Sequence, residues 1–480
     1  MLSLPSCATR QAPEPSPEVV QRFRFGGPEA VEIRREKEER WTLSNGLTVL
    51  FIPDNELPLV SGALYIPGGD LWEKPGEIGV VSTMGSLMRS GGTKELSPDE
   101  LDSKLRELAA EISSGFGDEF GTISFNCLAS DVEEVLGLYR DVIEEPRFDE
   151  SRLGLAKVHA LEGIRRRKDD PETIANITSQ VLMYRRSSKS GVMTSEDVRR
   201  LTRDSLVRAH NRFVRPDGAY LTITGNIDRK KLEALVLKEF SEWKPRGASL
   251  GEQASIPQPY APGVYFVEGD FNQATVMGVQ PGPPRHTEDR YAIRLMNNLF
   301  GDGLDSKLMK VVRSDKGLAY SVYGVVAEDY PVGKNLYFLQ TKTESVAEAL
   351  TTSLALLEEA REQPPTPDEL RLMQEGAQSA FVFKFTSPGQ ILSRLVALKL
   401  LGFPEDYDET YIQRIFAVQP QDVVGAAAKW WQPQALRLVV VGNKAVYEQL
   451  RGAMEKDPLL KRYPLHKISF TEVPHGKALS

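Results

Sequence analysis

The chain repeats itself at a fixed distance, and this repeat restricts its fold more than any other feature. In the segments RAHNRFVRPDGAYLTITGNI (208–227) and GAAAKWWQPQALRLVVVGNK (425–444), matching residues lie 217 positions apart. The matched pairs are Ala209 with Ala426, Pro216 with Pro433, Leu221 with Leu438, Gly225-Asn226 with Gly442-Asn443, Leu153 with Leu370, and Pro171 with Pro388. Solenoid repeats are only about 20 to 50 residues long, so a period of this length indicates a duplicated domain.

Each half is expected to contain the same order of strands and helices. In the first half we expect strands near 47–52, 59–66, 110–116, 121–128 and 218–225, and helices near 77–90, 98–109, 130–144, 149–168, 171–185, 196–213 and 228–241. Ser97 before Pro98 is a typical helix start, and Gly117-Asp118 is a typical hairpin turn. Strands in a run with helices grouped predict an α+β fold, in which each half packs helices on one face of a mostly antiparallel sheet.

Length and composition divide the chain further. At 480 residues, with 41% hydrophobic and 26% charged residues, it is expected to form at least two globular domains. We predict a flexible arm at 1–38, an N-terminal domain at 39–244, a Pro- and Gly-rich linker at 245–263, a C-terminal domain at 264–456 and a tail at 457–480. The net charge of −8 argues against a nucleic-acid partner.

The N-terminus allows two interpretations. Leu4-Pro5-Ser6-Cys7 loosely resembles the end of a bacterial lipoprotein signal, which would make Cys7 a lipid-bearing residue. The alternative is an ordinary cysteine in a Pro-rich tail. No apolar run reaches the ~18 residues of a membrane-spanning helix, so a membrane contact is expected only if Cys7 is lipidated. The bacterial periplasm, or a membrane-tethered lipoprotein, is favoured over the cytoplasm.

Two hydrogen-bond donors stand out in the second half. The segment DSKLMKVVRSDKGLAYSVY (305–323) places Arg313 seven residues before Tyr320, across the short turn at 314–317. An apolar periodic segment precedes the turn and an alternating, strand-like segment follows it. This arrangement can aim one guanidinium and one phenol at the same point. Both groups donate hydrogen bonds, and neither is a usual metal ligand.

The segments at 45–93 (NGLTVLFIPDNELPLVSG to MGSLMRSGGT) and 305–323 resemble the pitrilysin/insulinase-like zinc metallopeptidases. Active members of this family carry His-x-x-Glu-His, in which two His bind zinc and the Glu activates water. The resemblance, over roughly residues 39–455, implies that Ser82, Gly85 and Ser86 occupy these three positions. It also implies Gly163 at the later glutamate ligand, next to Glu162. None of the four degenerate positions can bind zinc or act as a base.

The histidines agree with this interpretation. The five histidines are at positions 159, 210, 286, 466 and 475, and no two of them have the spacing of a helical metal-binding pair. His159 and His210 are expected to be solvated or partly buried helix residues. A metal site built from residues distant in sequence stays open.

The resemblance implies a clamshell of two homologous domains that acts as a non-catalytic subunit. In the family an Arg and a Tyr of the C-terminal half reach the substrate near the zinc, and by position these are Arg313 and Tyr320. We expect no cofactor in this chain, zinc on a catalytic paralogue that carries His-x-x-Glu-His, and a peptide or unfolded polypeptide as substrate. The family's peptide-binding sheet edge corresponds to Tyr65–Asp70 (YIPGGD), in degenerate form.

Two other functions remain open at this stage. The chain could be a structural or binding subunit with no role in proteolysis, like the respiratory core proteins of the family. It could also be an active peptidase with a different metal site. Retention of the Arg313 and Tyr320 pair weighs against the structural subunit, because a scaffold does not need that pair, and the active peptidase ranks last.

Overall fold

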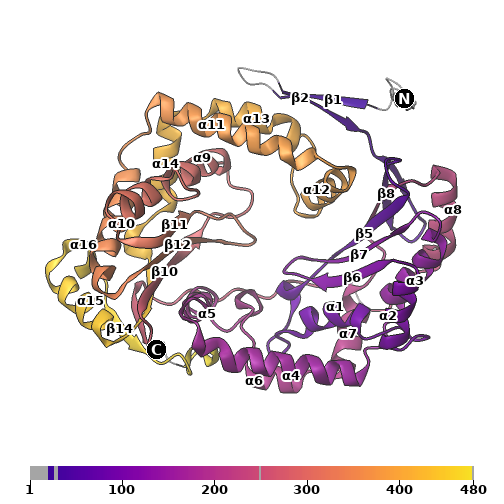
Figure 1. Cartoon of the computed structure of the whole chain (residues 1–480), viewed down its shortest axis with the longest axis horizontal. Coiled ribbons are helices and arrows are strands. Elements are labelled where there is room, and N and C mark those ends of the chain that lie inside the picture. The colour runs from indigo at the N-terminus through magenta and orange to yellow at the C-terminus, as the bar shows by residue number, and fades with distance from the viewer. Residues whose placement is uncertain (1–19, 26–30, 248–249, 478–480) are drawn as a thin grey trace, which may run out of the picture.

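The structure, a computed structural model, describes residues 20–25, 31–247 and 250–477. Its two halves lie on opposite sides of the molecule, as Figure 1 shows, and each contains one six-stranded sheet with helices around it. This confirms the predicted α+β fold with two homologous domains. Cys7 lies outside the described residues, and in the described part no helix is long and apolar enough to cross a bilayer.

Five strands of each sheet have the same order, and the sixth differs, because it is β3 in the first sheet and β14 in the second. The first runs β3 (Glu39–Thr42), β4 (Thr48–Pro53), β8 (Tyr220–Gly225), β5 (Leu59–Pro67), β7 (Phe120–Leu128), β6 (Glu111–Phe116). The second runs β14 (Leu465–Ile468), β9 (Gly263–Glu268), β13 (Arg437–Gly442), β10 (Gln273–Gly282), β12 (Gly333–Lys342), β11 (Ala319–Val325). Neighbours pair antiparallel except β4 with β8, β9 with β13 and β9 with β14, so both sheets are mostly antiparallel. A separate hairpin, β1 (Val20–Phe25) with β2 (Val31–Glu36), precedes them.

The helices follow a similar order in the two halves, except that the π-helical turn Met309–Asp315 takes the place of α2 and that α16 has no counterpart in the first half. The first half has α1 (Val80–Ser90), α2 (Pro98–Glu107), α3 (Val132–Glu144), α4 (Glu150–Arg166), α5 (Pro171–Tyr184), α6 (Ser195–Arg200), α7 (Arg203–Phe213) and α8 (Arg229–Phe240). The second has α9 (Arg290–Phe300), α10 (Val346–Ala360), α11 (Pro367–Val382), α12 (Pro388–Leu400), α13 (Tyr407–Ala417), α14 (Pro420–Trp430), α15 (Lys444–Lys456) and the short α16 (Pro458–Lys461).

Two sequence expectations need correction. The single helix expected at 196–213 is broken into α6 and α7, because the Thr202 side chain accepts a hydrogen bond from Ser205 N and starts a new helix. The segment expected as a tail at 457–480 contributes β14 to the second sheet, where it pairs with β9. Leu465 and Ile468 of this short strand pack against the apolar clusters of the sheet. Two apolar residues were too weak a pattern to predict this strand from the sequence.

Each half lends one helix to the sheet of the other half. Helix α5 packs on the second sheet in a cluster with buried residues Ile174, Ile177, Val181, Met277, Val279 and Val439. Helix α12 packs on the first sheet in a cluster with Leu50, Ile52, Tyr65, Ile391, Leu392 and Val396, and Figure 1 shows it reaching toward β8 and β5. Helices of its own half cover the opposite face of each sheet. The sequence predicted helices on one face of each sheet, and the exchanged helix covers the other face as well.

Candidate functional site

Helix α1 carries the three positions at which the resemblance implies a lost metal motif. Ser82 is half-buried and Ser86 exposed, and their hydroxyls donate hydrogen bonds to helix carbonyls, Gly79 O at 3.4 Å and Thr83 O at 3.2 Å. Serine is a poor zinc ligand, so α1 has no metal-binding side chain at these positions. Among the described residues, no group of three or more His, Cys, Asp and Glu side chains is arranged to hold a metal ion.

Gly85, which the resemblance places at the position of the catalytic glutamate, lies where α1 packs closely on β6. A Cβ atom at this position would lie 2.6 Å from Phe116 N, at the end of β6. The Ser114 hydroxyl of the same strand donates a 2.6 Å hydrogen bond to Gly85 O. Helix and strand are thus too close for a glutamate at position 85, and the packing of α1 on β6 is built around glycine.

The fourth degenerate position lies on α4. Gly163 is exposed, and a Cβ atom there would have no atom within 4 Å. Its neighbour Glu162 forms ion pairs with Arg165 at 2.8 Å and Arg166 at 2.6 Å. Hydrogen bonds from these two guanidinium groups lower the pKa of Glu162 to about 2. Glu162 is therefore a surface ion-pair residue in this chain.

A buried acid, Glu73, and a half-buried one, Asp70, lie beside α1, and sequence reasoning missed both. The Glu73 side chain is buried and accepts hydrogen bonds from Gly79 N at 3.1 Å and Val81 N at 2.8 Å. Burial, with a contribution from the nearby Asp70, raises the pKa of Glu73 to about 8. Burial and the charge of Asp118 raise the pKa of Asp70 to about 7. The available signal was a carboxylate just before a helix whose N-cap, Gly79, has no capping side chain.

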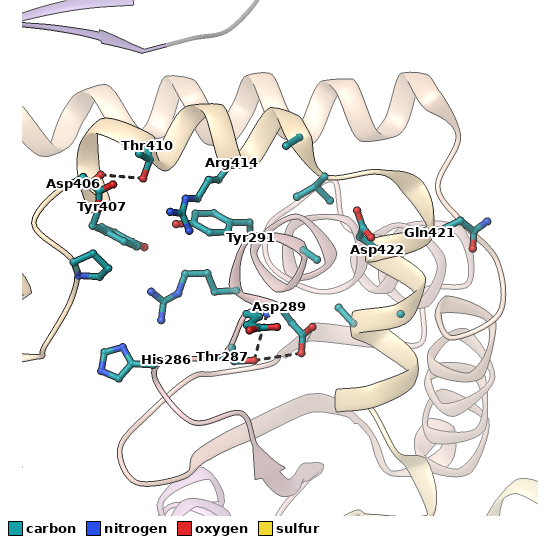
Figure 2. A pocket seen from close by; sticks show the side chains of 18 residues that line it. His286, Thr287, Asp289, Tyr291, Asp406, Tyr407, Thr410, Arg414, Gln421 and Asp422 are labelled. Atoms are coloured by element: carbon teal, nitrogen blue, oxygen red, sulfur yellow. Dashed lines mark hydrogen bonds between the residues drawn. The ribbon is translucent and has the colours of Figure 1, made fainter.

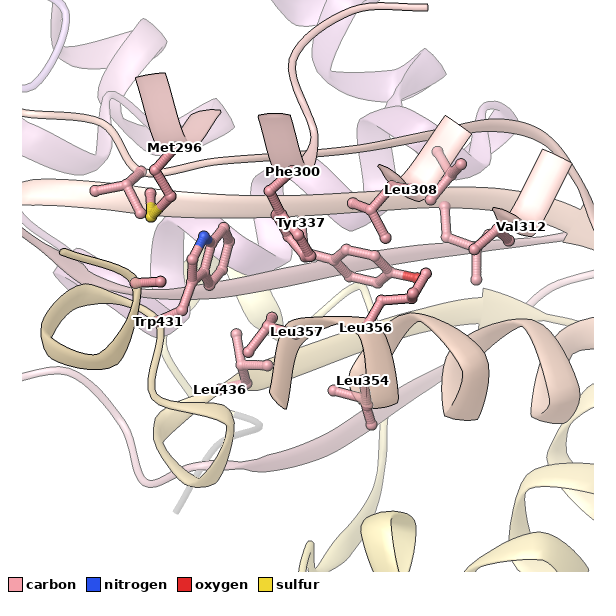
Figure 3. Close-up of a cluster of buried hydrophobic side chains, with 14 of the residues drawn as sticks. Met296, Phe300, Leu308, Val312, Tyr337, Leu354, Leu356, Leu357, Trp431 and Leu436 are labelled. Atoms are coloured by element: carbon pink, nitrogen blue, oxygen red, sulfur yellow. The ribbon is translucent and has the colours of Figure 1, made fainter. Parts of the chain in front are cut away.

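Arg313 lies on a turn that the core holds in place. Residues Met309–Asp315 form a π-helical turn, in which Val312 is fully buried beside Leu308 and Tyr337, as Figure 3 shows. Arg313, the next residue, is exposed, and its side chain forms no ion pair or hydrogen bond with another described residue. π-Helical turns are rare in proteins, and where a single one occurs it is often at a functional site.

Tyr320 lies at an irregular point of the edge strand β11. The pairing of β11 with β12 shifts register between Ala319 and Ser321, so that Tyr320 is the extra residue of a β-bulge. Leu318 and Val322 are buried in the core, whereas Tyr320 is 51% exposed. The regular alternation expected for these three residues therefore fails at Tyr320, because a bulge redirects a side chain. The convergence of Arg313 and Tyr320 on one point stays a prediction.

The segment Tyr65–Asp70 is not a free sheet edge, which corrects the expectation of a degenerate peptide-binding edge there. Strand β5 lies between β7 and β8. The backbone after it is also occupied, because Gly68 N donates to Glu119 O at 2.7 Å and Asp70 N donates to Gly117 O at 3.0 Å. The edges of the two sheets near the expected site are β6 and β11.

A cavity of about 890 Å³ lies elsewhere in the C-terminal half (Figure 2). Helices α13 and α14 line it, together with the start of α9. A cavity of about 240 Å³ is at the equivalent place in the N-terminal half, where Arg200 and Arg208 stand in place of Ala417 and Gly425. The two residues of the larger cavity have shorter side chains than the two arginines. None of the predicted site residues lines either cavity.

Comparison with known proteins finds similarity to one class of protein, the zinc metallopeptidases of the M16 family. Residues 200–377 match the family described as peptidase M16 inactive domain. An uncharacterized zinc protease of Rickettsia bellii is 22% identical over 380 residues, which cover 74% of this chain and 91% of that protein. One of Bacillus subtilis is 24% identical over 412 residues, which cover 84% and 98%.

Solved structures show the same fold. The peptidase M16 inactive domain from Pseudomonas fluorescens aligns with a TM-score of 0.75 at 22% identity, covering 85% of this chain and 98% of that one. The periplasmic protease PqqL from Escherichia coli aligns with a TM-score of 0.73 at 16% identity, covering 92% of this chain and 49% of that one. The family match over residues 200–377 and the two relatives confirm the resemblance to the pitrilysin/insulinase-like, or M16, metallopeptidase family, and the solved structures show the shared fold.

Proposed function

We propose that this chain is the non-catalytic subunit of a two-chain zinc endopeptidase. The partner is a paralogue that carries His-x-x-Glu-His and holds the zinc. Zinc does not fit the position of the family's motif on α1, because Ser82 and Ser86 are poor ligands and Gly85 has no room for a base. The observation that carries the proposal is the state of Arg313, an exposed cation that has no partner among the described residues, on a turn that Val312 anchors in the core.

The role of Arg313 and Tyr320 follows from their chemistry. A guanidinium and a phenol both donate hydrogen bonds, and both are accessible at the β11 end of the second sheet. When the two groups donate these hydrogen bonds to a peptide carbonyl at the partner's zinc, they stabilise the negative charge that develops on the carbonyl oxygen during hydrolysis. The loss of one such donor costs on the order of 10²–10³ in kcat. The substrate is a peptide or an unfolded polypeptide, since a folded protein does not present a free backbone.

Co-expression with a His-x-x-Glu-His paralogue tests this proposal. The pair should cleave peptides, whereas each chain alone should not, and metal analysis should find zinc in the partner. Arg313→Ala and Tyr320→Phe should lower kcat by about 10²-fold or more with the assembly intact. The matched control is Arg451→Ala, an exposed arginine of α15 that pairs with Glu448. If both site variants kept full activity, the chain would be a structural subunit that donates no group to the site. Stoichiometric zinc in this chain would contradict both the donating and the structural subunit.

A further inference from the structure

The cavity of about 890 Å³ in the C-terminal half has the size of a site for a small ligand. It lies between α13 and α14, with the start of α9 on the third side (Figure 2). Sites that bind small molecules usually enclose about 300–1,000 Å³ and combine an apolar lining with a few polar groups. Here Ala292, Val418 and Ala426 supply apolar surface, and α13 adds polar side chains.

Gly425 keeps one wall of this cavity free of a side chain. It lies in the middle of α14, where glycine is less stable than residues with a side chain. Packing does not require it, because a Cβ atom at this position would have no atom within 4 Å. The matching residue 217 positions earlier is Arg208, which lines the cavity of about 240 Å³ in the first half. The fold therefore accepts a long side chain at this place, and the second half leaves the space open.

Two opposite charges on α13 line the cavity without an ion-pair partner. Asp406, Thr410 and Arg414 follow each other at intervals of four residues, so they share one face of the helix. Within the described part of the chain, neither the Asp406 carboxylate nor the Arg414 guanidinium forms an ion pair with another side chain. Arg414 instead lies beside Tyr291, 5.7 Å from the centre of its ring, as Figure 2 shows.

Most other charged groups of the lining already have a partner. Asp289 pairs with Lys429 at 2.6 Å, and Arg290 pairs with a glutamate of the loop after β11 at 3.0 Å. Asp422 accepts a hydrogen bond from the backbone at the start of its own helix. Glu288 is a further exposed acid, without an ion pair to any residue that the structure describes. A ligand would therefore find free carboxylates and a single free guanidinium.

The spacing of the free charges on α13 indicates the ligand. Asp406 and Arg414 are eight residues apart in the sequence, which is about 12 Å along an α-helix. An extended peptide advances about 3.3–3.6 Å per residue, so about three or four residues span this distance. A guanidinium binds a carboxylate through two parallel hydrogen bonds, and a carboxylate accepts hydrogen bonds from an ammonium group. The Thr410 hydroxyl, between the two charges, can bind a peptide group.

We propose that this cavity binds a short peptide of about three or four residues with free ends. The C-terminal carboxylate of the peptide binds Arg414, its N-terminal ammonium binds Asp406, and Thr410 contacts the backbone between them. Neither Arg313 nor Tyr320 lines the cavity, so this site is separate from the one proposed for hydrolysis and needs no partner chain.

Titration calorimetry with tetraalanine tests the site on the isolated full-length chain. The peptide should bind in equimolar amount, and amidation of its C-terminus or acetylation of its N-terminus should weaken binding about tenfold. Arg414→Gln should weaken binding of the free peptide by the same factor and should leave binding of the amidated peptide unchanged. Absence of binding, or equal binding of the free and the blocked peptides, would overturn the proposal.

A variant that fills the cavity completes the test. Gly425→Arg introduces the residue type that the first half has at the matching position, and it should abolish tetraalanine binding with an unchanged circular dichroism spectrum. The matched control is Gly376→Arg in the middle of α11, where a Cβ atom also has open space, and it should bind like the parent chain.

Asp406→Asn serves if the filled variant does not fold. It should weaken binding of the free peptide about tenfold and leave binding of the acetylated peptide unchanged. Binding that survives Gly425→Arg in a folded chain would mean that the peptide binds elsewhere, and the proposal would be wrong. No step of this test measures proteolysis, so its outcome is independent of the proposed function.

Discussion

Pro171 and Pro388, which lie 217 residues apart, each occupy the first turn of the helix that its half gives to the other. The N-cap residues before them, Asp170 and Ser387, both accept hydrogen bonds from the first helical turn. Proline is well suited to this position because it needs no hydrogen-bond acceptor there. The duplication thus preserved the start of the exchanged helix in both copies, and the exchange is a symmetric property of the fold.

Shortening a buried side chain of an exchanged helix should destabilise the whole chain. Leu392 of α12 is 1% exposed within the cluster on the first sheet. Leu392→Ala should lower the free energy of unfolding by about 2–5 kcal/mol, because it leaves a cavity in that cluster. Urea unfolding followed by fluorescence measures the change, and the exposed Leu372→Ala should change it by less than about 0.5 kcal/mol. Unfolding of the second half alone, with the first half unaffected, would contradict the coupling of the halves.

The close contact of α1 with β6 predicts opposite effects for two glycine variants. Gly85→Ala should destabilise the chain by roughly 1–3 kcal/mol, since its Cβ atom would lie 2.6 Å from Phe116 N. Gly163→Ala, on the exposed face of α4 with open space around it, should stabilise by about 0.5–1 kcal/mol. Thermal unfolding of the two variants measures both signs. Equal behaviour of the two would show that α1 can move away from β6.

The two acids beside α1 should make stability fall as the pH rises. With pKa values of about 7 and 8, Asp70 and Glu73 hold protons in the folded chain that the unfolded chain has already released. Their protonated form stabilises the fold at low pH, and this contribution is lost as the pH rises through those values. Over the ~1.5 pH units from pH 6.5 to 8, the free energy of unfolding should decrease. Asp70→Asn should flatten this slope, and the exposed Asp99→Asn should not.

His210 should have the opposite effect in acid. Its ring is buried, its Nε2 lies 2.7 Å from Ile143 O, and burial lowers its pKa to about 4. The unfolded chain takes up this proton below a pH of about 6.5, so stability is lost as the pH falls from there toward 4. His210→Gln should show a smaller loss over this range in urea unfolding. His159→Gln, on the exposed face of α4, is the control and should match the parent chain.

Several features followed from the sequence because they depend on local pattern. Pro171 and Pro388 lie at the same offset as the other matched pairs, and this constant offset indicated the duplication. The positions of strands and helices followed from periodicity and turn residues. The absence of the metal motif was predicted once the resemblance placed Ser82, Gly85 and Ser86 at its positions, because serine is a poor zinc ligand and glycine has no base.

Other features were decided only by tertiary contacts. Nothing local distinguishes α5 or α12 from a helix that stays with its own sheet, since the apolar face is the same in both cases. The bulge at Tyr320 exists because β12 pairs with β11 out of register there. Glu73 became a buried acid because its own chain folds back onto the start of α1. Residue type and spacing therefore determined which groups this protein has, and long-range packing decided which of them are buried, paired or left free.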